Sequence, residues 1–314
     1  MNNNEFLKSF IGERPVGSKA NNMILDIIQV EAEQIGLEVV SHPFECKIWD
    51  KGKSYIISGN ESYEIFPSPF SRQYQGYGEI EVIHSIEELN RIDINDKIVF
   101  LQGNISKEQL QPKDFSFYYP EDHKHIIDLL EGKNPKALIA VTGKHPMCGL
   151  DPFPLFEDGN FSVPSAYISM LTANKIMQEK GIINLCIDSD NINAKSRQII
   201  ATRRAKGQAI GKILVCAHMD TKYGTPGAID NASGVAVMLN VMKNFQNYNG
   251  IYDIDFAPFN GEEYYEAKGE LEYLNMIKND YDQIKLVINI DSPCHKDSKI
   301  AVSSYNLKRI CTLS

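Results

Sequence analysis

The chain has 314 residues, which suits one large domain or two ordinary ones, because a single hydrophobic core stops growing at roughly 250–300 residues. Its composition, 43% hydrophobic and 23% charged, excludes a disordered or low-complexity protein. The net charge of −9, without a long basic run, argues against nucleic-acid or anionic-membrane partners. We find neither an apolar stretch of ~18 residues nor a secretory signal. These features predict a globular, cytoplasmic protein.

Three kinds of segment follow one another. Apolar spacings of three and four predict an amphipathic helix over residues 21–36, and a strand follows over 37–49. Short β-like runs and turn-rich segments then indicate a separate β-rich unit. Beyond it, strands alternate with helices as in βαβ units. We therefore predict an α/β fold in which residues 1–55 and 190–314 form a mostly parallel mixed sheet sandwiched by helices, around an inserted β-rich domain at 56–189.

The last segment has the pattern β-α-β-α-β. Strands are predicted at 212–217, 251–259 and 285–290, with helices over about 235–245 and 269–278. Polar residues stand just beyond the carboxyl end of each strand, which is where open α/β sheets build their sites. The sequence thus predicts one functional rim.

The first strand ends in His218 and Asp220, which share a side of the extended chain because they lie two residues apart. A carboxylate beside an imidazole is typical of a metal-ligating histidine, although such a pair also occurs on plain surfaces. Asp230 precedes the next helix among small residues. Either Asp230 or Asn231 could instead cap that helix.

The second strand leads to adjacent carboxylates, Glu262 and Glu263, whose side chains diverge, and the third leads to Asp291. Bringing these acids together with Asp230 would cost on the order of 4 kcal/mol per pair at ~4 Å and an effective dielectric near ~20, unless a cation lies among them. We therefore predict a divalent metal. Zinc is the first choice for one imidazole and several carboxylates, and manganese or cobalt would suit the same donors.

Four strings occur in order: ILVCAHMDT, GAIDNASGVAVML, APFNGEEYYEAKGELEYL and VINIDS. Together they resemble the successive signatures of the co-catalytic dizinc aminopeptidases, related to bacterial leucyl aminopeptidase and to the catalytic domain of glutamate carboxypeptidase. The string RPVGS, at residues 14–18, is similar to the same family. The middle region, with DKIVFLQG, PKALIAV and VPSAYIS, resembles the protease-associated domain that is often inserted in these enzymes.

The resemblance implies a zinc exopeptidase-like fold and a set of metal ligands. His218 and Asp291 would hold the first ion, Asp230 would bridge two ions, and Glu263 would hold the second. Glu262 would be the general base for a metal-activated water, and Asp220 would orient His218. The resemblance also implies a cis peptide bond between Asp230 and Asn231.

The sequence departs from the family at its carboxyl end. The family takes its last ligand, a histidine, from a strand well beyond the third motif, and only 23 residues follow Asp291 (314 − 291). His295 is the one histidine left, and it is more typical of a loop residue. Helical spacing at Leu307, Ile310 and Cys311 continues to the end, so we expect a truncated chain with one or two metal ions.

These observations predict a metal-dependent exopeptidase that hydrolyses peptides, removing their amino-terminal residues. One alternative is a non-catalytic or truncated relative that binds at most one metal. Another is a carboxypeptidase, dipeptidase or amide deacylase on the same fold. A more distant alternative is a binding module in which the β-rich insert captures partners. The sequence leaves the oligomeric state open.

Overall fold

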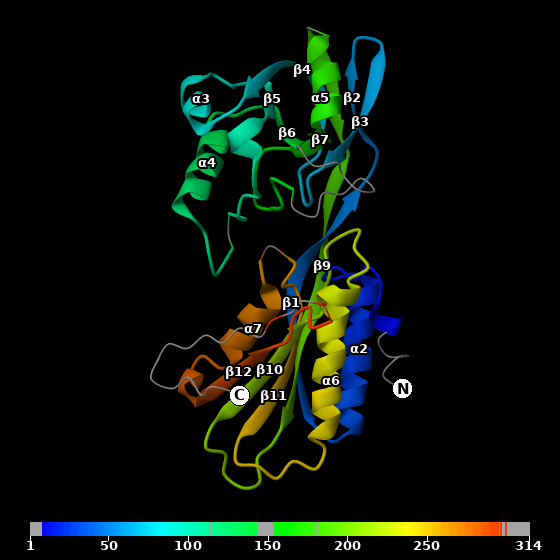
Figure 1. The fold of residues 1–314 in the computed structure, drawn as a ribbon, viewed down its shortest axis with the longest axis vertical. Helices are drawn as coiled ribbons and strands as arrows, with labels where there is room; N and C mark the ends of the chain where they lie inside the picture. Colours follow the sequence, from blue (N-terminus) through cyan, green and yellow to red (C-terminus); the bar gives the residue numbers. More distant parts are fainter. Residues whose placement is uncertain are drawn as a thin grey trace.

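The structure is a computed structural model that describes residues 8–113, 115–142, 154–179, 181–264, 266–294, 296 and 299. Figure 1 shows two units along the long axis: a sheet flanked by helices, and a barrel above it. No helix within the described residues is long and apolar enough to cross a membrane.

The sheet of the first unit has five strands in the order β1-β9-β11-β10-β12. Their bounds are Glu38–Lys51 (β1), Ser189–Arg203 (β9), Lys212–His218 (β10), Asp253–Phe259 (β11) and Ile284–Asn289 (β12). Strand β10 is parallel to β11 and β12, whereas β9 is antiparallel to both β1 and β11. The sheet is mixed, as predicted, but only two of its four strand pairings are parallel, so it is less parallel than expected. The reason is that the chain leaves the sheet along β1, forms the barrel and returns along β9 beside β1, so that these two strands run antiparallel.

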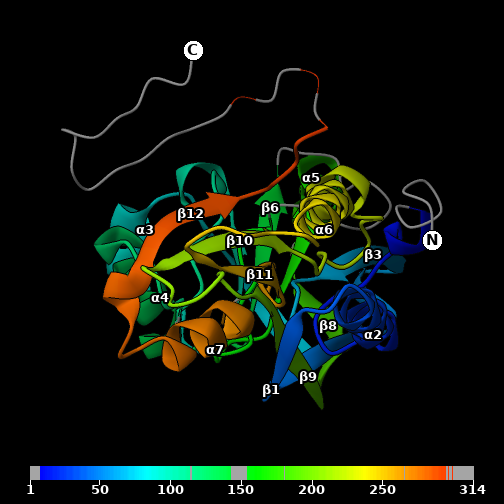
Figure 2. The same ribbon diagram turned by 90° about the horizontal axis from the view of Figure 1, so that it is seen from below.

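Helices lie on both faces of this sheet. Helices α2 (Lys19–Gln34) and α6 (Gly234–Asn244) cover one face and α7 (Lys268–Met276) lies on the other (Figure 2). Ile28 of α2 and Met238 of α6 are buried against Phe256 of β11. Tyr273 of α7 packs on the opposite face, in a smaller cluster. Apolar side chains of β9, β10 and β11 therefore alternate between two cores, as expected of strands buried on both faces.

The elements predicted around the site are confirmed to within about two residues. The helix expected at 21–36 is α2, and the strands expected at 37–49, 212–217, 251–259 and 285–290 are β1, β10, β11 and β12. Ser18 begins α2 by accepting a hydrogen bond from the Asn21 backbone N–H at 3.1 Å. His295 and the helical pattern at the carboxyl end lie outside the described residues.

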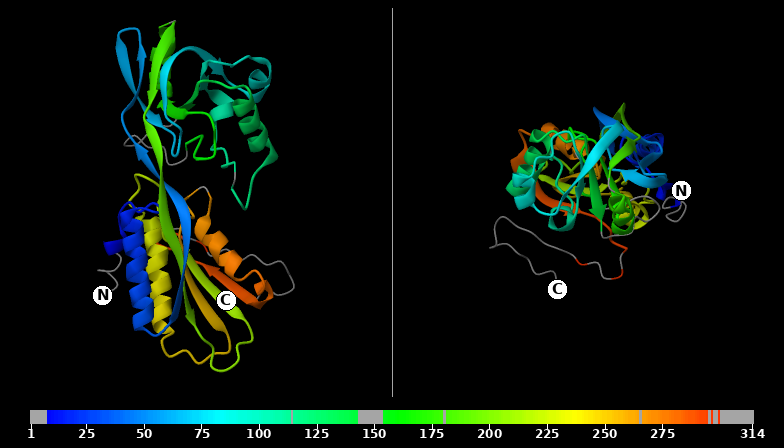
Figure 3. Two further views of the ribbon diagram at one scale, coloured as in Figure 1. Left: turned by 180° about the vertical axis from the view of Figure 1, so that it is seen from behind. Right: turned by 90° about the horizontal axis from the view of Figure 1, so that it is seen from above.

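The second unit is a closed barrel in the order β2-β3-β7-β6-β5-β4-β8. Its strands are Ser54–Ser58 (β2), Glu61–Pro67 (β3), Tyr74–Ile83 (β4), Ile98–Leu101 (β5), Ala137–Thr142 (β6), Ser165–Ser169 (β7) and Ile182–Ile187 (β8). Its helices are Ile86–Arg91 (α3), Glu121–Gly132 (α4) and Met170–Gln178 (α5). Strands β1 and β9 pair along their whole length and run from the sheet to the barrel (Figure 3).

Candidate metal centre

The predicted site residues follow the ends of the three parallel strands. His218 is the last residue of β10, Glu262 comes three residues after β11, and Asp291 comes two residues after β12. Asp230 lies in the short helical segment η2 (Ala228–Ser233), just before α6. The backbone of this segment is non-helical at Asp230 and Asn231. Because parallel strands end at the same edge, these segments converge on one rim of the sheet.

Three of the predicted ligands form one compact group. The donor atoms of His218, Asp230 and Asp291 all lie within 4.8 Å of one another. The Nε2 atom of His218 is 2.8 Å from Oδ1 of Asp230 and 3.7 Å from Oδ1 of Asp291. The imidazole is only 5% exposed, whereas the carboxylates of Asp230 and Asp291 are 58% and 46% exposed. A cation arriving from solvent could therefore reach all three donors.

The chemistry of this group fits a divalent metal ion. One imidazole nitrogen and two carboxylate oxygens are donors that zinc accepts, and three protein ligands leave a further position open. Within the described part of the chain, no lysine or arginine lies within 4.0 Å of Asp230 or Asp291. Burial opposes charge on His218, but the carboxylates of Asp220, Asp230 and Asp291 raise its pKa. The contact with His218 lowers the pKa of Asp291, so the group already favours a positive charge at its centre.

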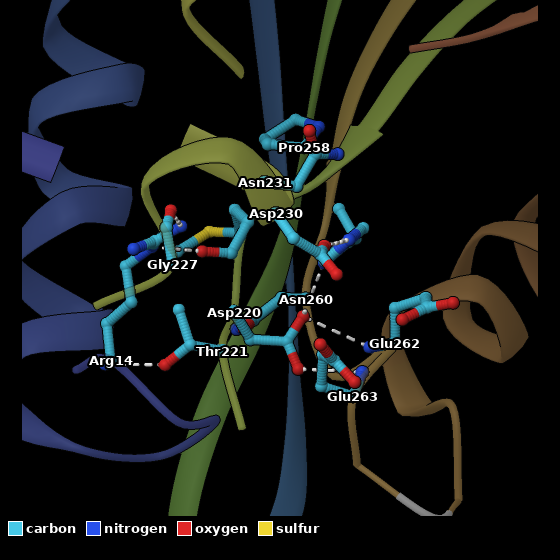
Figure 4. Close-up of polar contacts among 12 residues, drawn as sticks. Arg14, Asp220, Thr221, Gly227, Asp230, Asn231, Pro258, Asn260, Glu262 and Glu263 are labelled. Atoms are coloured by element: carbon cyan, nitrogen blue, oxygen red, sulfur yellow. Dashed lines mark hydrogen bonds and ion pairs between the residues drawn. The ribbon is translucent and has the colours of Figure 1, made fainter. Parts of the chain in front are cut away.

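Asp220 lies on the other side of the imidazole. Its Oδ1 is 3.8 Å from Nδ1 of His218, which is too far for a hydrogen bond, and that buried nitrogen has no partner among the described residues. The Asp220 carboxylate instead accepts hydrogen bonds from the backbone N–H groups of Glu262 at 3.1 Å and Glu263 at 3.0 Å (Figure 4). That Asp220 orients His218 stays a prediction. The observed hydrogen bonds show that Asp220 holds the backbone of Glu262 and Glu263.

The two glutamates line different pockets, as their predicted divergence requires. Glu262 lines a pocket of about 330 Å³ together with His218 and Asp291. Although Glu262 reaches solvent, desolvation raises its pKa, and the nearby acids Asp220, Asp291 and Asp230 raise it further. Glu262 is thus a carboxylate of increased basicity beside the three donors.

Glu263 lines a second pocket, together with Asp230 and Lys222. Its Oε2 is 3.9 Å from Nζ of Lys222. Burial, opposed by Lys222 and reinforced by Asp220 and Glu262, raises the pKa of Glu263 to about 8. Glu263 is not part of the three-donor group, so the described residues assemble one compact site rather than two.

Asn231 connects the two segments that carry the exposed carboxylates of the group. Its Oδ1 accepts hydrogen bonds from the backbone of Gly234 at 3.0 Å and of Ser292 at 3.2 Å. Its Nδ2 donates to the carbonyl of Ile290 at 2.9 Å. The Asn231 side chain therefore bonds the first residue of α6, although the N-cap of that helix is Ser233, whereas Asp230 faces His218. The peptide bond between Asp230 and Asn231 is cis, which confirms the expectation.

Some residues around the site were missed by the sequence interpretation. Asn260 is fully buried and bonds Asn21 at 2.8 Å and Ser196 at 2.8 Å, which holds the end of β11 in place. Lys222 pairs at 2.7 Å with Glu157 of the barrel. Neither pairing leaves a signal in the sequence, because the partners are far apart along the chain.

The segment that carries the site is similar to a known protein family. Residues 198–310 match the model of peptidase family M28. This segment belongs to peptidase family M28. The predicted resemblance to the dizinc aminopeptidase family is thereby confirmed, and the chain is a metallopeptidase-type hydrolase. No curated protein matches the chain.

Solved structures share the fold of the M28 segment and of the barrel. An aminopeptidase from Aneurinibacillus sp. strain AM-1 has 18% identity and a TM-score of 0.71, with 93% of this chain and 70% of that chain covered. The zinc aminopeptidase BSAP from Bacillus subtilis has 17% identity and a TM-score of 0.69, with 92% and 68% covered. A peptidase M28 precursor from Shewanella amazonensis has 19% identity and a TM-score of 0.65, with 90% and 68% covered.

Proposed function

We propose that this chain is a zinc-dependent aminopeptidase that removes amino-terminal residues from peptides. The observation that carries the proposal is the compact group of His218, Asp230 and Asp291 beside Glu262, at the carboxyl edge of a sheet in an M28 segment. These three residues would hold one zinc ion. Glu263, which lines the neighbouring pocket with Asp230, would hold a second ion more weakly. The relative titled as a zinc aminopeptidase supports the choice of metal.

Zinc in such a site supplies Lewis acidity toward a peptide carbonyl and lowers the pKa of water. Glu262 takes a proton from the attacking water and returns it to the leaving amine. Desolvation and the nearby acids raise the pKa of Glu262, which increases the affinity of its carboxylate for a proton. Asp220 keeps Glu262 in place through the backbone bond at 3.1 Å.

The barrel contributes to the same pocket. Phe115 and Phe117, which precede α4, line it together with Phe259 and Val287 of the sheet. Apolar walls beside convergent polar groups are typical of small-ligand sites. We propose that the barrel at Ser54–Ile187 is the inserted, protease-associated-type domain and that its Phe115 and Phe117 contact the substrate side chain.

Two measurements test the proposal. Metal analysis of the purified chain should find at least one zinc per chain after loading and dialysis. Hydrolysis of amino-acyl nitroanilides should be detectable and should be lost when the amino group is acetylated. Cleavage of acetylated substrates, or of carboxyl-terminal residues, would instead identify a deacylase or a carboxypeptidase. Zinc binding without any turnover would identify a non-catalytic relative.

A further inference from the structure

Arg14 is a fully buried arginine next to the metal centre, with a side chain 1% exposed. Its Nε donates to the carbonyl of Met219 at 2.6 Å, and its Nη2 donates to the carbonyl of Gly227 at 3.0 Å. Its Nη1 donates to three further carbonyls, those of Phe10 at 2.7 Å, Gly12 at 3.1 Å and Pro226 at 3.4 Å. The guanidinium thus bonds backbone oxygens at both ends of one loop.

That loop lies between two of the three donors, His218 and Asp230. Met219 directly follows His218, and Gly227 lies three residues before Asp230. A rigid guanidinium that holds both ends fixes the separation between the segments from which the imidazole and the carboxylate project. The backbone N–H of Arg14 adds a bond to Oγ1 of Thr221 at 2.9 Å (Figure 4). The N–H of Gly12 donates to the carbonyl of Pro226 at 2.8 Å.

The contact between Arg14 and Gly227 requires a glycine at position 227. Its φ is +54°, in the left-handed region that favours glycine. A Cβ atom there would lie 2.7 Å from Nη1 of Arg14 and 2.1 Å from Cγ2 of Thr221. Any side chain at this position would push against the guanidinium, so the loop and Arg14 fit each other closely.

Burying the charge of Arg14 costs free energy that an apolar side chain at the same place would not cost. Within the described residues it has no carboxylate within 4.0 Å. Burial lowers its pKa to about 10, and Asp220 and Asp230 act in the opposite direction. Its guanidinium therefore remains a cation at neutral pH and, among the described residues, donates only to carbonyl groups. Burying a charge without an ionic partner costs free energy unless hydrogen bonds compensate it, and here the compensating acceptors are mainly carbonyls of the loop that joins two metal-ligand segments.

We propose that Arg14 is a positioning residue of the metal centre, which holds the loop between Met219 and Gly227 so that His218 and Asp230 meet around the ion. The inference rests on the proposed zinc site. Arg14 is the first residue of the string RPVGS, which lies more than 200 residues before the loop in the sequence. The inference thus assigns a function to this string.

The test is the zinc affinity of Arg14→Lys, measured by competition with a chromogenic chelator. Lysine keeps the charge but offers one ammonium group, which cannot bond both ends of the loop. Because loss of an outer partner of a metal ligand typically costs 10–100-fold in affinity, we expect a decrease of about that size. The control is Ile28→Ala, a core change in α2, which should lower thermal stability and leave zinc affinity within about twofold.

Zinc affinity in Arg14→Lys equal to that of the wild type, or reduced no more than in the control, would overturn the inference. If Arg14→Lys does not fold, Thr221→Val decides: it removes the acceptor of the Arg14 N–H while keeping the side-chain shape. Several-fold weaker zinc binding would support the positioning role, and unchanged binding would refute it. A wild-type chain that binds no zinc refutes the proposed function as well, whereas normal zinc binding in all variants refutes the role of Arg14 alone.

Discussion

The acidic residues of the rim divide into two groups with different surroundings. Asp230 and Asp291 lie 2.8 Å and 3.7 Å from the imidazole of His218 and are about half exposed, and among the described residues neither has a lysine or arginine within 4.0 Å. Glu263 is instead 3.9 Å from Lys222, which is itself paired at 2.7 Å with Glu157 of the barrel. Asp230 and Asp291 therefore lack a neighbouring lysine or arginine among the described residues, whereas Glu263 already has the ammonium group of Lys222 beside it. Carboxylates that look equivalent in sequence therefore differ in their need for a metal, and we expect two sites of unequal affinity.

The largest effect should come from the first group. Replacing His218 with alanine removes the only nitrogen donor of the group among the described residues, so zinc affinity should fall by more than the ~100-fold that loss of an outer partner can cost. Turnover should disappear with the metal. Metal content after dialysis measures this, with His84→Ala, an exposed histidine of the barrel, as control. Unchanged zinc content would remove His218 from the ligand set.

Glu262→Gln should separate chemistry from binding. The amide cannot accept the proton, so kcat should fall by about 10²–10⁴-fold while zinc content stays at the wild-type level. Glu266→Gln, a nearby acid that pairs with Lys268, should change neither quantity. Zinc lost together with activity would mean that Glu262 is a ligand rather than the base.

Lys222→Met tests the second group directly. Without the ammonium group, Glu263 loses the cation that competes with a second metal ion, so affinity for that ion should rise by about tenfold, a fraction of the ~4 kcal/mol between charges at ~4 Å. A cobalt titration monitored by absorbance would measure it. Lys97→Met, which removes a lysine from the barrel surface, provides the matched control. Weaker binding of the second ion in Lys222→Met would contradict the idea that Lys222 competes with that ion for Glu263.

The last effect is on stability rather than on metal binding or turnover, and it concerns Glu270 of α7, which lines the pocket with Glu262. Burial, reinforced by Asp220, raises its pKa from 4.5 to about 8, and its Oε2 has no partner among the described residues. The folded state then binds more protons than the unfolded state between these values. The free energy of unfolding of the metal-free protein should fall as pH rises from 4.5 to about 8, by at most ~1.4 kcal/mol per pH unit.

Glu270→Gln should remove that part of the pH dependence. Urea unfolding at several pH values measures it, with Glu272→Gln on the same helix as control. A slope equal to that of the wild type in Glu270→Gln would show that Glu270 ionises normally in the folded protein. Any slope that remains should come from other buried acids, first of all Glu263.

Much of the fold could be predicted because its signals are local. The apolar spacing of α2 and the alternation of strands and helices from β10 to β12 depend on neighbouring residues, and these elements lie where expected. The convergence of His218, Asp230 and Asp291 followed from a topological rule, that parallel strands end at one edge. The antiparallel place of β9 could not be predicted, because it depends on how the chain returns from the barrel.

The sequence by itself determined the order of the elements around the rim and the residue types that follow each strand, since both depend on periodicity and on short motifs. Only the tertiary structure decided which charges neutralise one another. It placed Lys222 between Glu157 and Glu263, and it brought Arg14 to carbonyl groups 205 and 213 residues away. Pairings of this kind leave no local pattern, because they arise from the packing of segments distant in the chain.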